Sequence, residues 1–135
     1  MKKSVLIVED NSLNSELLRD WLEGEGYETL IAADLNAAFA AVRGQPPDVV
    51  LLDVQLGTDD GLLLASWMLE QPVLCLIPVI AVTAQAMVTE RQRILASGCR
   101  SVVPKPFDFA VLQEQLRFWL SRAEALQENQ LPGKR

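Results

Sequence analysis

The clearest indication of the fold is the stretch Val49-Val50-Leu51-Leu52-Asp53. Four apolar residues in a row, without polar alternation, are typical of a strand that is covered on both faces of a parallel sheet. The strand ends in a carboxylate. Similar apolar runs occur at Ser4 to Val8, which is followed by two acids, and at Val79 to Val82, which is followed by Thr83. The sequence therefore predicts several buried strands with polar side chains at their carboxyl ends.

Helical patterns separate these strands. An apolar stripe with helical spacing begins after Ser12, which could cap the helix as Asn11 could; its members are Leu13, Leu17, Leu18, Trp21 and Leu22. Asp34 and Asp108 are further candidate caps for helices that start just after them. We expect two more strands, at 28–32 and 101–103, a loop over 54–61, and helices over 35–44, 62–70, from about 88 to 98, and from 109 onward.

Five strands that alternate with five helices predict an α/β domain with a doubly wound parallel sheet, in which the crossovers are right-handed and helices cover both faces. Ligands of such folds bind beyond the carboxyl ends of the strands, where the strand order reverses. The residues at those ends are Glu9, Asp10, Asp53, Thr83 and Lys105. They are therefore the candidate functional residues.

The composition of the chain argues against several classes of function. The chain has 135 residues, and 12 Lys and Arg against 18 Asp and Glu give a net charge of −6, which argues against binding nucleic acid directly. The absence of His excludes a Ser-His-Asp triad and most zinc sites. Cys75 and Cys99 lack the spacing of a metal or redox motif. No signal peptide is expected, and two prolines interrupt the uncharged stretch at 71–89, so we predict a cytoplasmic protein without a membrane span.

The carboxylates suggest metal and phosphoryl chemistry. Three of them at one edge would repel one another unless a cation lies among them, and oxygen ligands without His or thiolate favour Mg²⁺. Asp53 could then act as a nucleophile toward a phosphoryl group, with Lys105 and Thr83 contacting the transferred oxygens. Each residue alone has an ordinary explanation as a turn former, helix cap or surface charge. The hypothesis of metal and phosphoryl chemistry rests on their occurrence together at the predicted strand ends.

These residues resemble the receiver domain of two-component response regulators. The resemblance spans about residues 3–120, and its motifs are Val8-Glu9-Asp10-Asn11, Leu51-Leu52-Asp53, Asp60-Gly61-Leu62, Val82-Thr83-Ala84 and Lys105-Pro106-Phe107. It implies a flavodoxin-like sheet of order 2-1-3-4-5. It also implies that Asp53 accepts the phosphoryl group. Glu9, Asp10, Asp53 and the Gln55 backbone carbonyl would hold Mg²⁺. Thr83 and Lys105 would sense and hold the phosphoryl group, and the Lys105–Pro106 bond would be cis.

Two positions depart from the family pattern. Gly57 stands where the family usually has proline, which loosens the loop after Asp53. Val102 stands where an aromatic side chain usually swings inward when Thr83 moves. Because valine has one stiff χ1 angle and no ring, the usual aromatic switch is absent or works differently.

The resemblance implies a phosphorelay switch rather than a metabolic enzyme, with Mg²⁺-dependent self-phosphorylation and slow autodephosphorylation as its only chemistry. Its partners would be a histidine kinase or histidine phosphotransfer protein and a downstream protein at the surface of the fourth helix, fifth strand and fifth helix. A homodimer through Phe118 and Trp119 is a further option, although core packing also explains these aromatics. We assign residues 3–122 to the receiver and 123–135 to a helix extension or linker that could be disordered.

Two alternatives come from other classes. One is a degenerate receiver that binds partners without phosphorylation, which Gly57 and Val102 keep open. The other is a haloacid-dehalogenase-like phosphatase, whose motif needs a second Asp two residues after the nucleophile and a Thr two residues later. Those positions hold Gln55 and Gly57, which lack the acid and the hydroxyl.

Overall fold

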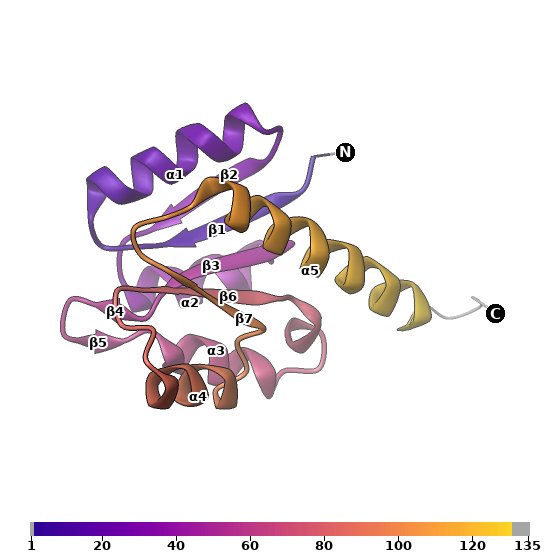
Figure 1. Ribbon diagram of the computed structural model, residues 1–135. Coiled ribbons are helices and arrows are strands. Elements are labelled where there is room, and N and C mark those ends of the chain that lie inside the picture. The colour runs from indigo at the N-terminus through magenta and orange to yellow at the C-terminus, as the bar shows by residue number, and fades with distance from the viewer. Residues whose placement is uncertain (1, 131–135) are drawn as a thin grey trace.

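The computed structural model describes residues 2–130 and contains a central parallel sheet of five strands in the order β2-β1-β3-β6-β7 (Figure 1). The strands are β1 (Ser4–Val8), β2 (Glu28–Ala32), β3 (Val49–Asp53), β6 (Val79–Thr83) and β7 (Ser101–Pro104). Counting only these strands along the chain, the order is 2-1-3-4-5, which confirms the expected flavodoxin-like topology.

Five α-helices cover the sheet on both faces: α1 (Ser12–Gly24), α2 (Leu35–Gly44), α3 (Leu62–Leu69), α4 (Val88–Ala96) and α5 (Phe109–Gln130). Helices α1 and α5 lie on one face, and α2, α3 and α4 lie on the other (Figure 1). A short 3-10 helix, Leu74–Leu76, precedes β6 and was not expected. No helix within the described part of the chain is long and apolar enough to span a membrane.

The central strands place alternate side chains in two separate cores, because successive residues of a strand point to opposite faces. On strand β1, Leu6 contributes to the core under α2, α3 and α4, and Ile7 contributes to the core under α1 and α5. Every residue of β3 and β6 is buried. This burial on both faces is the physical reason that these strands read as uninterrupted apolar runs.

Side-chain caps fix the starts of three helices. The Asn11 side chain accepts a hydrogen bond from the Asn14 amide at 3.0 Å, and Asp34 accepts one from Ala37 at 2.7 Å. Asp108 accepts one from the Ala110 amide at 3.0 Å. Each bond satisfies a backbone donor that has no partner inside the helix. The first of these caps matters for function because it sets the start of α1 directly after the two acids that follow β1.

The segment after Asp53 differs from the expectation of a loop. It forms a small antiparallel hairpin of β4 (Gln55–Leu56) and β5 (Asp59–Asp60), with Gly57 at the turn. Gly57 has φ +60°, a conformation that glycine adopts without steric cost. Two strands of two residues each are too short to show a periodic pattern, which explains why the sequence did not predict them.

Part of the predicted apolar stripe of α1 is wrong. Leu18 and Leu22 are buried as expected, but Leu13 and Leu17 are 74% and 51% exposed. The helix buries only the narrow face that contacts the sheet, so two leucines of the stripe remain at its border with solvent. On α5, Trp119 packs against the core, whereas Phe118 is 51% exposed. Helix α5 continues to Gln130, so residues 123–130 are helical, which was one of the two expectations for the segment after residue 122.

Candidate functional site

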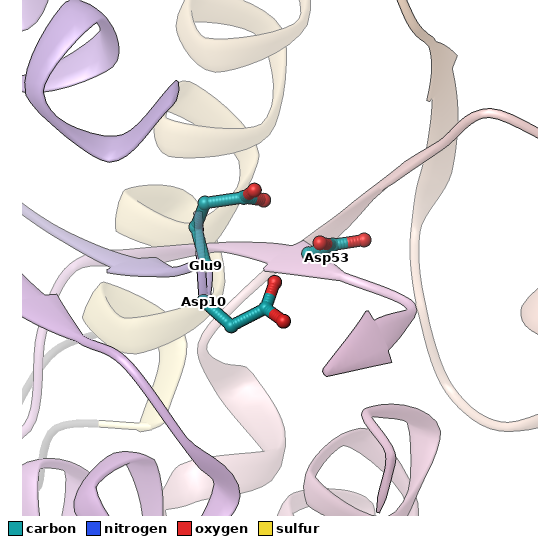
Figure 2. A group of neighbouring side chains, drawn as sticks. All are labelled: Glu9, Asp10 and Asp53. Atoms are coloured by element: carbon teal, nitrogen blue, oxygen red, sulfur yellow. The ribbon is translucent and has the colours of Figure 1, made fainter. Parts of the chain in front are cut away.

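Three carboxylates converge at the carboxyl edge of the sheet (Figure 2). Glu9 and Asp10 follow β1, and Asp53 ends the neighbouring strand β3, which pairs with β1 in parallel. Each residue offers a carboxylate oxygen, and these oxygens lie within 4.8 Å of one another. Figure 2 shows the three carboxylates turned toward a common space. The structure thus brings together the three acids that the sequence placed at strand ends.

Glu9 is an unusually placed acid, because only 4% of its surface is exposed. Burial, and after it the hydrogen bond and the charge of the neighbouring Asp53 carboxylate, together raise its pKa from 4.5 to about 7. Lys105 and Asn14 act in the opposite direction. Burial and Asp53 thus disfavour the charged form of Glu9, and a cation bound among the carboxylates would favour that form again.

Lys105 lies between two of the acids. Its Nζ is 3.3 Å from Glu9 Oε2 and 3.3 Å from Asp53 Oδ2. The residue follows β7, the edge strand beside β6, and the peptide bond between Lys105 and Pro106 is cis, as the resemblance implies. One ammonium group thus neutralises part of the charge of the carboxylates and lies within reach of any group bound to Asp53.

Backbone amides hold the carboxylates of Asp53 and Asp10. The Gln55 N–H donates to Asp53 Oδ1 at 3.2 Å, and the Gly57 N–H donates to Asp10 Oδ2 at 3.0 Å. Asp10 is exposed, whereas Asp53 is buried, with 7% of its surface exposed. The hairpin after β3 therefore contacts the site at two points, and it leaves Asp10 open to solvent and ions.

Thr83 is the last residue of β6, the strand next to β3. It follows Val82, which lies directly opposite Asp53 in the sheet. Its side chain is buried and is bonded to Gln85: the hydroxyl accepts from the Gln85 N–H at 3.0 Å and donates to the Gln85 carbonyl at 3.3 Å. The hydroxyl is thus engaged with the loop that leads into α4. To contact a group on Asp53 it would have to exchange these partners.

Val102 lies on β7 opposite Ala81 and is 9% exposed. It belongs to the core that also contains Ile94 of α4 and Met68 of α3. The side chain at this position is therefore part of the packing beneath α4 and carries no ring that could turn toward solvent.

Two residues near the site, Asn14 and Gly61, make contributions that sequence reasoning did not assign to them. The Asn14 side-chain amide donates to Glu9 Oε1 at 3.3 Å, so Glu9 has a partner on each oxygen. A Cβ on Gly61 would collide with the backbone carbonyl of Asp53, so only glycine allows the chain to pass this close to the site. The contact of Asn14 with Glu9 could have been predicted from the spacing of Asn11 and Asn14. A residue three positions after a helix cap lies on the same face of the helix as the cap, and therefore near the residues that precede the helix.

The donor set fits a hard divalent cation. Three carboxylates without imidazole or thiolate are the ligand types that suit Mg²⁺ and similar ions, which usually take one or two carboxylates and keep several waters. Asp10, at the exposed side of the cluster, leaves room for such waters. The residues present could therefore hold a metal ion.

Comparisons with known proteins agree with this geometry. The family model described as "Response regulator receiver domain" matches residues 5–117. The curated "Polar-differentiation response regulator DivK" of Brucella anthropi is 41% identical over 123 residues, which are 91% of this chain and 100% of that protein. A putative response regulator from Chloroflexus aurantiacus has a TM-score of 0.85 at 27% identity, with coverage of 90% and 99%. The receiver domain of a histidine kinase from Syntrophus aciditrophicus gives 0.81 at 32%, with coverage of 88% and 90%. The chain belongs to the response regulator receiver domain family.

Proposed function

We propose that this receiver domain is a phosphorelay switch that accepts a phosphoryl group on Asp53. The observation that carries the proposal is the placement of the Asp53 carboxylate, which lies 3.3 Å from Lys105 and within 4.8 Å of the Glu9 and Asp10 oxygens. A nucleophilic carboxylate beside an ammonium group and a cation site is the arrangement that phosphoryl transfer to an aspartate needs.

In the proposed reaction, an oxygen of Asp53 attacks the phosphorus of a phosphohistidine on a kinase or phosphotransfer protein. The bond between phosphorus and the imidazole nitrogen breaks, and the imidazole leaves as the aspartyl phosphate forms. The Gln55 N–H holds the carboxylate in one orientation, which reduces the cost of reaching the reactive geometry. Lys105 then contacts a phosphoryl oxygen, and Thr83 exchanges Gln85 for another.

Glu9, Asp10, Asp53 and the Gln55 carbonyl would hold Mg²⁺, which when bound neutralises charge on the transferring phosphoryl oxygens. Phosphorylation would shift the surface of α4, β7 and α5 toward a conformation that a downstream protein binds. We further propose that the domain works in the cytoplasm, with residues 123–135 as its extension, and that hydrolysis of the aspartyl phosphate is its only other chemistry. The similarity to DivK, which is named a response regulator, supports this proposal.

The test is incubation with acetyl phosphate and Mg²⁺, followed by intact mass measurement of the wild type and of Asp53→Ala. We expect one hydroxylamine-labile phosphoryl group on the wild type and none on Asp53→Ala. Phosphate that appears equally on both would refute Asp53 as the acceptor. No phosphate on the wild type, with a beryllofluoride mimic also failing to bind, would favour the degenerate receiver.

A further inference from the structure

The hairpin of β4 and β5 connects the acidic site with α4. Its two strands pair through Gln55 with Asp60 and through Leu56 with Asp59. One end of this hairpin contacts a candidate metal ligand, and the other contacts an arginine of α4. The hairpin thus provides a path of polar contacts from the site to that helix.

The contact at the turn depends on glycine. The Gly57 N–H donates to Asp10 Oδ2 at 3.0 Å, from a backbone conformation with φ +60°. Proline, the usual family residue at this position, has no N–H and a φ fixed near about −65°, so it could not make this contact. The departure from the family pattern therefore creates a direct bond between the hairpin and the candidate cation site.

The contact at the other end is an ion-pair network. Asp60 Oδ2 is 3.1 Å from Arg93 Nη1, and the Nη2 of the same arginine is 2.7 Å from Glu90. The second oxygen of Asp60 accepts a hydrogen bond from the Leu62 N–H at 3.0 Å, at the start of α3. Arg93 thus ties the hairpin to α4.

The base of the hairpin is fixed to strand β3. The Gly61 N–H donates to the Val54 carbonyl at 2.8 Å, and a Cβ on Gly61 would collide with the carbonyl of Asp53. A base held this closely cannot slide. A rearrangement of the turn therefore cannot be relieved by sliding of the base, and it acts on the side-chain contacts of the hairpin, of which the Asp60–Arg93 pair is one.

We infer that the β4–β5 hairpin couples cation binding at Asp10 to the position of α4. A cation on Asp10 competes with the Gly57 N–H for the same carboxylate, and the release of the turn strains the Asp60–Arg93 pair at the other end. This coupling would take the place of the aromatic switch that Val102 cannot provide. It rests on the proposed function, because it requires that the acidic cluster binds Mg²⁺.

The coupling has a reciprocal consequence. If cation binding disturbs the Asp60–Arg93 pair, removal of that pair must strengthen cation binding by the same factor. Both partners are about half exposed, with side-chain exposures of 46% and 48%. Exposed ion pairs contribute little free energy to a conformation. Removal of the pair should therefore lower the Mg²⁺ dissociation constant only about two- to fivefold.

The experiment is a titration with Mg²⁺ alone, by calorimetry, on the wild type, Arg93→Ala, Asp60→Asn and the double variant. Asparagine keeps an oxygen for the Leu62 N–H. Each single variant should bind Mg²⁺ more tightly, and the double variant no more tightly than either. A purely long-range effect of charge predicts opposite signs, because losing a positive charge tightens cation binding and losing a negative charge weakens it. Opposite signs would overturn the inference.

Arg91→Ala is the matched control, because Arg91 carries the same charge on α4 and takes part in none of the ion pairs recorded among residues 2–130. It should reproduce only the small long-range effect. In the same titrations, backbone amide NMR signals of α4 should shift with Mg²⁺ in the wild type and shift less in Arg93→Ala. A wild type that binds no Mg²⁺ contradicts the proposed function itself. Normal Mg²⁺ binding with unresponsive α4 signals contradicts only the coupling.

Discussion

Replacing Glu9 by glutamine should remove most of the pH dependence that this site imposes on stability. The pKa of Glu9 rises from 4.5 to about 7 in the folded chain, mainly because burial disfavours the charged form. The folded chain therefore holds a proton that the unfolded chain releases. The stabilisation from this proton is present below pH 4.5 and is lost as the pH rises through about 7.

The magnitude follows from the size of the shift. A difference of about 2.5 pKa units at about 1.36 kcal/mol each gives roughly 3 kcal/mol between pH 4 and pH 8. This is an upper value, because Glu9 and Asp53 titrate as a pair and share the proton. It is still a large part of the stability of a small domain, about 5–15 kcal/mol.

The assay is urea denaturation followed by tryptophan fluorescence, in the presence of EDTA, at pH 5 and pH 8. Between pH 5 and pH 8 the wild type should lose up to about 2.5 kcal/mol more stability than Glu9→Gln, because glutamine stays neutral and because part of the effect has already occurred by pH 5. Glu16→Gln is the control, since Glu16 is an exposed acid on α1 outside the site. Equal pH dependence of the wild type and Glu9→Gln would refute the reasoning.

Three further predictions concern the site and the core. Lys105→Met should slow phosphorylation of Asp53 by acetyl phosphate at least about tenfold, since the loss of one charge contact costs about 1.5–3 kcal/mol; intact mass against time measures it, and an unchanged rate would contradict the role of Lys105. Gly61→Ala should destabilise the fold by about 1–3 kcal/mol in urea denaturation, because its Cβ meets the carbonyl of Asp53; wild-type stability would show that the hairpin base moves freely. Leu116→Ala, at a fully buried position, should cost about 2–5 kcal/mol, whereas Phe118→Ala, at a half-exposed one, should cost less than about 1 kcal/mol; similar losses would show that Phe118 is covered.

The buried strands of the sheet and the candidate residues at its edge could be predicted from the sequence. The apolar runs of β1, β3 and β6 need cover on both faces, and only a parallel sheet between helices supplies it. Because the carboxyl ends of parallel strands meet at one edge, the positions of Glu9, Asp10 and Asp53 along the chain already implied that they converge. The helix caps could be predicted for the same reason, since a cap acts within three residues of its helix.

Tertiary structure alone decided the contacts between distant segments. The raised pKa of Glu9 depends on its burial and on Asp53 from another strand. The bond from Gly57 to Asp10 and the pair of Asp60 with Arg93 join residues that are 47 and 33 positions apart. Local periodicity carries no information about such pairs. They form because the folded sheet brings the ends of its strands to one edge, and burial and charge then decide which side chains meet there.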